Sequence, residues 1–347
     1  MGSNRLPSHS PRTDPGRNRG VRLSVLVTGG CGFLGAHIVR RLLDNSSLDA
    51  EPVEVSVSEM KELFEKVKPQ VIIHTASPDP LDTGALQKTN VDGTKILLRC
   101  ATVCPETRAF VYTSSDSACQ PTQEPIAEDK VKLYDEHHYN NLYGKTKAIG
   151  DTMVLEASSS DLHTATLRIP AIYGEEDHNF IPQLLESVRK GEHKMQIGNN
   201  GKLFEFCYVG SAAEAHILAA KELLRADEGV QDPRVDGEAF FIIDGVSRKF
   251  FDFARDAYAA AGAPVAPDEI KIIPLWAIQL MASTGEWAYR IFTLGTKKPK
   301  MARQSIDHLD GGAYWSIDKA RRRLGYKPVL SQEDAIKQSV KWGLEHL

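Results

Sequence analysis

A glycine-rich turn, set between an apolar run and a helical pattern, constrains the fold of this chain more than any other feature. Residues 25–35 read Val-Leu-Val-Thr-Gly-Gly-Cys-Gly-Phe-Leu-Gly, which predicts a strand, a tight turn and a helix. The run fits G-x-G-x-x-G from Gly30 and T-G-x-x-G-x-x-G from Thr28. Glycines at these positions allow a positive φ and close packing of helix on strand. Unpaired N–H groups at the start of the helix are then available to bind phosphate.

The composition is typical of a soluble globular protein. The 347 residues, 41% hydrophobic and 25% charged, suffice for a sizeable core and more than one structural unit. A net charge of -4 argues against nucleic acid as a partner. The five cysteines are odd in number and lack C-x-x-C spacing, so we expect reduced thiols, no metal and a cytoplasmic location. Residues 1–20 lack the apolar core of a secretory signal and are predicted to be a disordered tail.

Beyond the turn, strand-like and helix-like segments alternate. This alternation predicts an α/β fold, with a Rossmann-like, doubly wound parallel sheet that forms a dinucleotide-binding domain over residues 21–175. Residues 176–347 are predicted to form mostly a smaller substrate-side subdomain, with some elements returning to the sheet. The predicted strands of the first domain are at residues 25–28, 71–78, 109–115 and 164–169, and its helices are at 33–44, 60–67, 90–104 and around 143–147.

The second half carries a looser pattern. Residues 272–285 are uncharged and rich in aromatic side chains, but too few to span a bilayer as a helix. We interpret them first as a core helix, and the alternatives are a cap over a hydrophobic substrate and contact with a membrane surface. Helices are also expected at 180–188, 211–224 and 250–261, and strands at 196–209, with a turn at 199–201, and at 239–243.

The segment between the first helix and residue 71 is short for such a sheet. It offers one strand, Val53–Val57, where a doubly wound nucleotide domain has two. The acidic residue that binds the ribose hydroxyls usually lies about 20 residues beyond the glycines. A remodelled sheet and a misplaced exon boundary both account for the shortening, and the choice between NAD and NADP stays open. The acidic residues available here are Asp44, Asp49, Glu51, Glu54 and Glu59, none of them clearly at the end of such a strand.

Tyr143 and Lys147 are four residues apart in a predicted helix, so their side chains project from one face. A phenol with a pKa near 10 is a poor base at neutral pH, and a lysine ammonium beside it, aided by the positive nicotinamide of a bound dinucleotide, is expected to lower that pKa. Ser115 ends a predicted strand, where it is placed to hydrogen-bond a substrate oxygen, and Ser114 is the neighbouring candidate. Together with the glycine turn, these residues predict proton abstraction beside a bound dinucleotide.

Six motifs together resemble the extended short-chain dehydrogenases/reductases. Within that superfamily the chain is similar to the 3β-hydroxysteroid dehydrogenase/isomerase family, and in it to the sterol-4α-carboxylate 3-dehydrogenase (decarboxylating) branch. The resemblance covers residues 22–347. The motifs that carry it are 28–35 (TGGCGFLG), 74–78 (HTASP), 112–115 (YTSS), 143–147 (YGKTK), 168–174 (RIPAIYG) and 315–326 (WSIDKARRRLGY).

This resemblance implies a Rossmann-like fold that uses NAD or NADP. It implies catalytic roles for Ser115, Tyr143 and Lys147, of which Tyr143 and Lys147 also contact the cofactor. The implied pyrophosphate contacts are Gly29, Gly32, Phe33, Leu34 and Gly35, and the implied wall beside the adenosine ribose is Ala76, Ser77 and Pro78.

The implied function is oxidation of the 3β-hydroxyl of a sterol or fused-ring terpenoid, with loss of carbon dioxide where a 4α-carboxylate is present. The alternatives are a redox-neutral double-bond isomerase of a steroid-like ketone, with a degraded cofactor site, and a non-catalytic dinucleotide binder. A homodimer and peripheral contact with the endoplasmic reticulum membrane are further alternatives. The spacing of His74, His137 and His138 fits no metal site, so we expect hydrogen-bonded or solvated roles for them.

Overall fold

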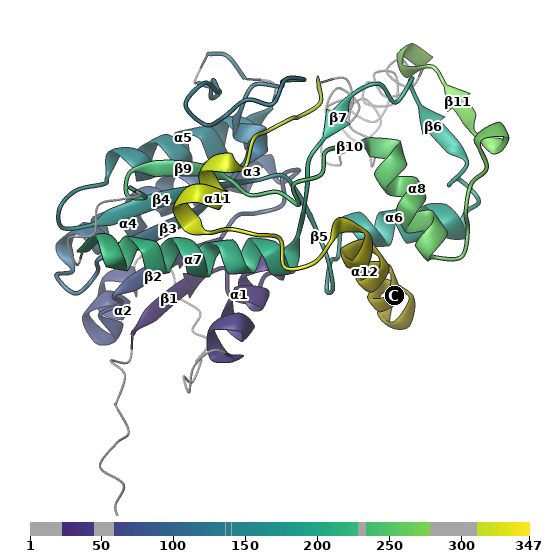
Figure 1. Cartoon of the computed structure of the whole chain (residues 1–347). Helices are drawn as coiled ribbons and strands as arrows, with labels where there is room; N and C mark the ends of the chain where they lie inside the picture. The colour runs from purple at the N-terminus through teal and green to yellow at the C-terminus, as the bar shows by residue number, and fades with distance from the viewer. Residues whose placement is uncertain (1–22, 45–58, 136, 140, 228–233, 278–310) are drawn as a thin grey trace, which may run out of the picture.

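A five-stranded parallel sheet forms the centre of the protein, in the order β1-β2-β3-β4-β9 (Figure 1). The computed structural model describes residues 23–44, 59–135, 137–139, 141–227, 234–277 and 311–347. Every residue of β2, β3 and β4 is buried, as expected for parallel strands covered on both faces. The five strands are β1 (Val25–Thr28), β2 (Val71–His74), β3 (Ala109–Ser115), β4 (His163–Ile169) and β9 (Glu238–Phe241).

Helices cover both faces of this sheet, which confirms the layered α/β fold predicted from the alternation of segments. One helical layer consists of α1 (Phe33–Asp44) and α7 (Val209–Asp227), which pack against each other. The opposite layer consists of α2 (Met60–Val67), α4 (Thr94–Val103) and α5 (Leu142–Glu156), which share a second hydrophobic cluster with the sheet.

Of the strands that the structure describes, β1 lies at one edge of the sheet and pairs directly with β2. In a doubly wound nucleotide domain the first strand instead lies in the middle of the sheet. All four residues of β1 are partly exposed, in contrast to the four buried residues of β2. The predicted strand Val53–Val57 and the predicted tail over residues 1–20 lie outside the described residues.

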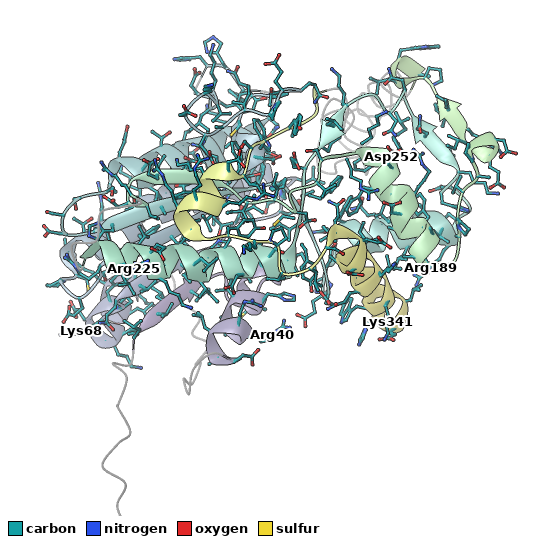
Figure 2. All side chains as sticks on the ribbon, in the orientation of Figure 1. Arg40, Lys68, Arg189, Arg225, Asp252 and Lys341 are labelled. Atoms are coloured by element: carbon teal, nitrogen blue, oxygen red, sulfur yellow. The ribbon has the colours of Figure 1, made fainter. Side chains whose placement is uncertain are left out.

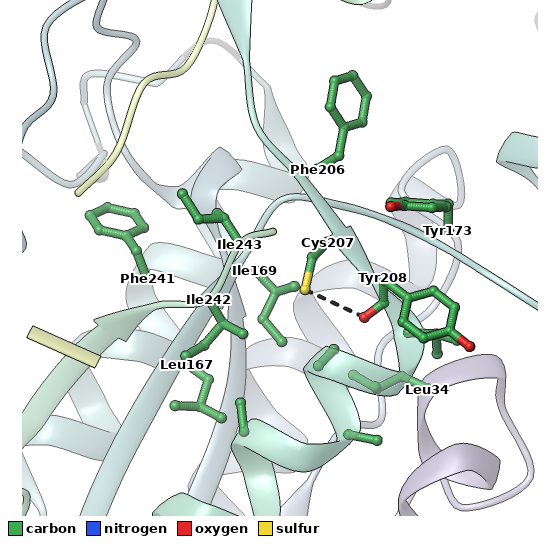
Figure 3. Close-up of a cluster of buried hydrophobic side chains, with 14 of the residues drawn as sticks. Leu34, Leu167, Ile169, Tyr173, Phe206, Cys207, Tyr208, Phe241, Ile242 and Ile243 are labelled. Carbon is green, nitrogen blue, oxygen red and sulfur yellow. Dashed lines mark hydrogen bonds between the residues drawn. The ribbon is translucent and has the colours of Figure 1, made fainter. Parts of the chain in front are cut away.

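A second group of elements packs beside the main sheet and shares its core. The helices α6 (Phe180–Arg189), α8 (Phe250–Ala260) and α12 (Gln332–His346) pack together. Figure 3 shows the apolar cluster between the two groups, in which Leu34 of α1 and Ile169 of β4 share one core with Phe206. The boundary predicted at residue 175 stays a prediction, and β9 and α7 of the second half lie in the main layers.

Three pairs of short strands complete this second group. The region 196–209, predicted to be extended, contains three short strands. They do not pair with one another across the turn at 199–201; each pairs with a segment distant in sequence, as tertiary packing requires. The pairs are β5 (Ala171–Tyr173) with β8 (Phe206–Tyr208), β7 (Leu203–Phe204) with β10 (Arg248–Lys249), and β6 (Met195–Ile197) with β11 (Lys271–Ile273).

Two predicted helices differ from the structure. The helix predicted to begin at residue 90 begins earlier, as α3 (Thr83–Leu86) and a π-helical turn, η2 (Gln87–Gly93), which leads into α4. The core helix predicted over 272–285 is wrong at its start, since Ile272 lies in β11 with an exposed side chain, and residues beyond 277 lie outside the described part. The remaining short elements are η3 (Asp116–Ala118), η4 (Pro267–Glu269) and α11 (Asp318–Leu324).

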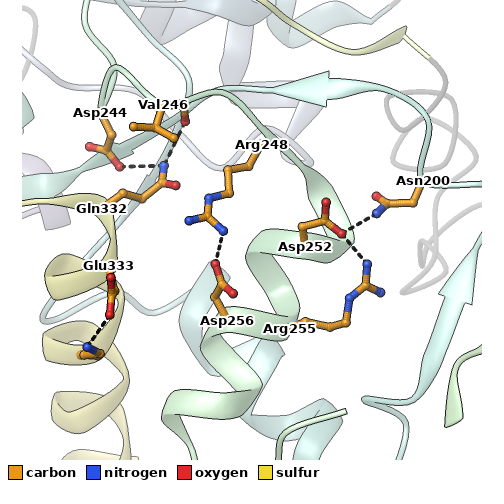
Figure 4. A network of polar contacts seen from close by, with 10 residues as sticks. Asn200, Asp244, Val246, Arg248, Asp252, Arg255, Asp256, Gln332 and Glu333 are labelled. Atoms are coloured by element: carbon orange, nitrogen blue, oxygen red, sulfur yellow. Dashed lines mark hydrogen bonds and ion pairs between the residues drawn. The ribbon is translucent and has the colours of Figure 1, made fainter. Parts of the chain in front are cut away.

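Polar side chains lie mainly on the outside of the molecule. Figure 2 shows this for Arg40, Lys68 and Lys341, on three different helices or their ends. In the region of α8 and α12, Arg248 of β10 forms an ion pair with Asp256 of α8, and the amide of Gln332 of α12 donates to the Val246 carbonyl (Figure 4). Among the residues described, no helix is both long enough and apolar enough to cross a membrane.

Candidate active site

The glycine turn after β1 has the tight geometry that its sequence predicts. Gly29 has a φ of +73°, and a Cβ there would lie 2.9 Å from the backbone of Ala76. The Gly32 N–H donates to the Gly29 carbonyl (2.9 Å), and a Cβ on Gly35 would lie 2.0 Å from that same oxygen. These close approaches leave room for glycine only and bring the start of α1 directly over the turn.

The start of α1 supplies N–H groups at the mouth of this turn. Phe33 is the first helical residue, and the side chain of Leu34 is buried in the core, which holds the helix end in place. Ala76 lies against Gly29, and Ser77 is exposed beside it. The residues predicted to bind a pyrophosphate are thus brought together around one helix N-terminus, where anions bind favourably.

The three predicted catalytic residues also come together, at the carboxyl end of β3. Ser115 is the last residue of β3, and Tyr143 and Lys147 lie on the first turns of α5. The N-terminus of α5 is capped by Asn141, whose side chain accepts a hydrogen bond from the Gly144 N–H (2.6 Å). A Cβ on Gly144 would lie 2.3 Å from a backbone oxygen of η3, so glycine here lets α5 approach the end of β3.

Lys147 is only 2% exposed, and its ammonium points into the protein. Its Nζ donates to the carbonyl oxygen of Thr113 (2.7 Å) and lies 4.8 Å from the centre of the Tyr112 ring. Ser115 is buried and its Oγ accepts from the Ser117 N–H (3.1 Å). The Ser115 hydroxyl also lies near Tyr143, where it lowers the pKa of the phenol. The serine and the tyrosine are therefore close together.

In the chain by itself the pKa of Tyr143 is raised. Burial raises it to about 12, the nearby Ser115 hydroxyl opposes this, and the charge of Asp116 adds to it. The lowering expected from Lys147, aided by the positive nicotinamide, stays a prediction; in this structure Lys147 directs its ammonium to Thr113, and burial lowers the pKa of Lys147 itself to about 7. The phenol of Tyr143 is therefore protonated at neutral pH until further positive charge enters the site.

The buried lysine gives a testable pH dependence of stability. Since the pKa of Lys147 falls from 10.5 to about 7 on folding, the unfolded chain binds more protons between these values. The free energy of unfolding from this group is thus lowest below pH 7 and rises with pH up to 10.5. From pH 6 to pH 9 we expect the free energy of unfolding of wild type to increase by about 2–3 kcal/mol more than that of Lys147→Met, as measured by chemical denaturation. Lys145 is a partly exposed lysine on the same helix, and Lys145→Met should show the same increase as wild type. If the free energy of unfolding of Lys147→Met increases as much as that of wild type, Lys147 is not the group responsible.

A buried ion pair fixes the catalytic helix against the sheet. Asp151, one turn beyond Lys147 on α5, accepts two hydrogen bonds from Arg168 of β4 (2.9 and 3.0 Å). Both side chains are buried, so removing one partner would leave an uncompensated charge in the interior. The Asp151 charge also partly opposes the burial that lowers the pKa of Lys147. Sequence reasoning missed this pair because the two residues are joined only by the packing of α5 on β4.

Asn90 is a second residue that sequence reasoning missed. It lies on the π-helical turn η2, a kind of irregularity that is frequent at functional sites. Its amide Nδ2 donates to the Thr146 hydroxyl of α5 (3.1 Å), while its buried Oδ1 has no hydrogen-bond partner among the residues that the structure describes. A buried amide oxygen in this state is costly and marks a position for a ligand or a water molecule.

Comparison with known proteins agrees with this arrangement. The sequence pattern of the 3-beta hydroxysteroid dehydrogenase/isomerase family matches residues 45–267. A sterol-4-alpha-carboxylate 3-dehydrogenase, decarboxylating, of Gibberella zeae is 52% identical over 294 residues, 84% of this chain and 96% of that protein. The enzyme of that name from Schizosaccharomyces pombe is 33% identical over 344 residues, 92% of this chain and 97% of that protein.

A solved structure shares the fold at low sequence identity. The Bordetella bronchiseptica enzyme WbmH, determined in complex with NAD+, superimposes with a TM-score of 0.67 at 18% identity and covers 94% of this chain and 99% of its own. The sequence matches go further than the fold, because each of the two relatives is matched along nearly its whole length. The chain belongs to the 3-beta hydroxysteroid dehydrogenase/isomerase family.

Proposed function

We propose that this protein oxidises the 3β-hydroxyl of a sterol that carries a 4α-carboxylate, with NAD or NADP as the hydride acceptor, and that carbon dioxide is then lost. The observation that carries the proposal is the meeting of Ser115, Tyr143 and Lys147 at the end of β3, in a chain 52% identical to the Gibberella zeae enzyme. A protein that only binds a dinucleotide has no need of this phenol.

The glycine turn fits the pyrophosphate of such a cofactor. Gly29, Gly32 and Gly35 leave bare backbone beside the N-terminus of α1, and Ala76 and Ser77 would lie beside the adenosine ribose. Bound there, NAD or NADP would supply the carbon that accepts the hydride and, in its oxidised form, a positive charge. The choice between the two stays open: of the candidate acidic residues, Asp44 and Glu59 are described and lie at the end of α1 and before α2, and the others lie outside the described residues.

The chain's own residues then have separate tasks in the reaction. Ser115 donates a hydrogen bond to the substrate oxygen, and the phenolate of Tyr143 takes the hydroxyl proton as the C–H bond breaks and the ketone forms. With the positive nicotinamide bound, the ammonium of Lys147 would help to favour the phenolate. The ketone lies β to the carboxylate, so the bond between C4 and the carboxylate can break with its electron pair passing to the ketone oxygen. Ser115 and the reprotonated Tyr143 are placed to stabilise that oxygen.

Purified protein tests the proposal directly. It is incubated with a 3β-hydroxy-4α-carboxy sterol and either NAD or NADP, and the absorbance of reduced nicotinamide, the 3-ketone and carbon dioxide are followed. We expect all three products in equal amounts with one of the two nucleotides. The proposal fails if neither nucleotide is reduced, and conversion of a β,γ-unsaturated ketone without nucleotide would instead favour the isomerase alternative.

We propose that, if the protein contacts a membrane, exposed apolar side chains of the β6–β11 pair make the contact. Met195, Ile272 and Trp276 are 43%, 62% and 68% exposed and lie on or just after the β6–β11 pair. We expect sedimentation with phospholipid vesicles for wild type and at least a threefold loss for the double variant Ile272→Ser/Trp276→Ser. Exposed Val103, on the far side of the sheet in α4, provides the control, since Val103→Ser should sediment as wild type. Equal sedimentation of wild type and the double variant would remove this role.

A further inference from the structure

A series of hydrogen bonds, which passes at Asn90 from the backbone carbonyl to the side-chain amide, joins the glycine turn to the catalytic helix. It begins at Thr28, the last residue of β1, and ends at the backbone of Tyr143 in the first turn of α5. Neither the fold nor the catalytic roles require these two ends to be connected through side chains. The links are Thr28 Oγ1 to His74 Nδ1 (2.6 Å), His74 Nε2 to Thr94 Oγ1 (2.9 Å), Thr94 Oγ1 to Asn90 O (2.8 Å), Asn90 Nδ2 to Thr146 Oγ1 (3.1 Å) and Thr146 Oγ1 to Tyr143 O (3.0 Å).

The direction of every bond in this chain is determined. A carbonyl oxygen can only accept, so Thr94 donates its hydroxyl proton to Asn90 and must accept from Nε2–H of His74. Nδ1 of His74 is then unprotonated and accepts from the Thr28 hydroxyl. Burial and, second, the charge of Lys147 lower the pKa of His74 to about 3, so the ring stays neutral across the physiological range. The hydrogen-bonded role expected for this histidine is confirmed.

The chain is held firmly at the glycine turn. The Thr75 hydroxyl and N–H both donate to the Thr28 carbonyl (2.8 and 3.2 Å). Thr28 is therefore bonded at its carbonyl by Thr75, the residue after β2, and at its hydroxyl by His74, the last residue of β2. Gly29, the next residue, has the left-handed backbone on which the turn depends. A shift of the turn therefore moves the Thr28 hydroxyl against the His74 ring.

The middle and far end of the chain are equally confined. His74, Asn90, Thr94 and Thr146 are each at most 4% exposed, and the His74 ring packs at 5.5 Å from the Tyr112 ring. The π-helical turn η2 allows Asn90 to reach α5 with its side chain and Thr94 with its carbonyl. If one of these side chains is displaced, its hydrogen-bonded neighbour must therefore move as well, because a water molecule cannot enter the buried site to replace the broken bond unless the surroundings rearrange.

We propose that His74 is a positioning residue that couples the nucleotide-binding turn to the catalytic helix, so that nucleotide binding and proton transfer at Tyr143 depend on each other. The predicted effect on catalysis rests on the proposed function. The predicted effect on nucleotide binding does not, and it concerns Thr28 and Thr94, which lie at opposite sides of the His74 ring. If the His74 ring transmits a displacement from either side, each hydroxyl should affect the property assigned to the other end.

Isosteric variants separate coupling from local effects. Thr94→Val removes a hydroxyl on the far side of His74 from the glycine turn, and we expect the Kd of NAD or NADP, measured by calorimetry on substrate-free protein, to rise at least fivefold. Thr28→Val removes the hydroxyl beside the turn, and we expect kcat at saturating nucleotide to fall at least fivefold. Each variant changes few atoms, so folding is expected to survive.

Variants of the histidine complete the test. His74→Leu should show both losses, and adding Thr94→Val to it should weaken nucleotide binding no further, since the chain is already broken. His74→Gln, which offers one acceptor and one donor, should recover part of both properties. His163→Leu is the control: His163 is buried at the first residue of β4, level with Val25 and Val71 and so at the opposite end of the sheet from the glycine turn.

Different results would overturn the coupling through His74 and the proposed function. The inference is overturned if Thr94→Val leaves the Kd unchanged and Thr28→Val leaves kcat unchanged, or if His163→Leu weakens nucleotide binding as much as His74→Leu does. A wild-type protein that binds nucleotide but oxidises no sterol would sink the proposed function alone. In that case the Kd of Thr94→Val still decides the coupling of His74 to the turn.

Discussion

Tyr143→Phe is expected to lower kcat for sterol oxidation by about 10³-fold while the Kd of the nucleotide changes by less than about threefold. The substitution removes the only atom proposed to take the hydroxyl proton and leaves the ring in place. Ser115 keeps the hydrogen bond from the Ser117 N–H (3.1 Å), so the end of β3 stays ordered. Steady-state rates at saturating nucleotide, together with binding measured by calorimetry, separate the loss of the proton acceptor from a loss of binding.

A second tyrosine on the same segment provides the control for this substitution. Tyr139 lies four residues before Tyr143 and is 44% exposed, with its ring against the ammonium of Lys145. Tyr139→Phe removes an equal hydroxyl and should retain the wild-type kcat. If Tyr143→Phe oxidises sterol at the wild-type rate, another group abstracts the proton, and the role proposed for the Ser115–Tyr143 contact is lost.

Features set by neighbouring residues were predictable from the sequence. The helix α2 ends before Lys68, as expected, and Lys68 adopts a left-handed conformation ahead of Pro69. This end follows from local preferences, since proline restricts the residue before it and cannot continue a helix. That Ser115 and Tyr143 lie at the same edge was predictable for a different reason: Ser115 ends a parallel strand and Tyr143 begins a following helix, and the carboxyl ends of parallel strands lie at the same edge of the sheet as the starts of the helices that follow them.

Features set by distant packing were not predictable in this way. Strands β6, β7 and β8 carry ordinary strand patterns, but nothing in their residues specifies β11, β10 and β5 as partners. The raised pKa of Tyr143 depends on burial and on the charge of Asp116, which a spacing of four residues cannot convey. His74 is the clearest case, since its neighbours in sequence give no sign that it bridges two threonines from other elements.

Gly35→Ala is expected to abolish measurable nucleotide binding, with a rise in Kd of at least about 100-fold, and to destabilise the fold by about 1–3 kcal/mol. The added Cβ would lie 2.0 Å from the Gly29 carbonyl oxygen and 2.9 Å from the Gly30 Cα. Both atoms are backbone, so no side chain can rotate away, and α1 must lift from the turn. Lifting α1 exposes Leu34 and Ile38, which are buried in the core, and moves the N–H groups at its start away from the phosphate position.

Gly84→Ala separates this close approach from the general effect of adding a methyl group to a glycine. Gly84 lies in the short helix α3, and the nearest atom to an added Cβ there is Asp82 Oδ1 at 3.6 Å, an ordinary contact. That variant should unfold at or slightly above the wild-type temperature, because alanine restricts the unfolded chain more than glycine does. Thermal denaturation and calorimetric titration with NAD and NADP measure both variants. Since the only difference between them is what the methyl group meets, a Gly35→Ala protein that binds nucleotide as well as Gly84→Ala does would mean that α1 need not lie on the turn, and the phosphate site would have to be placed elsewhere.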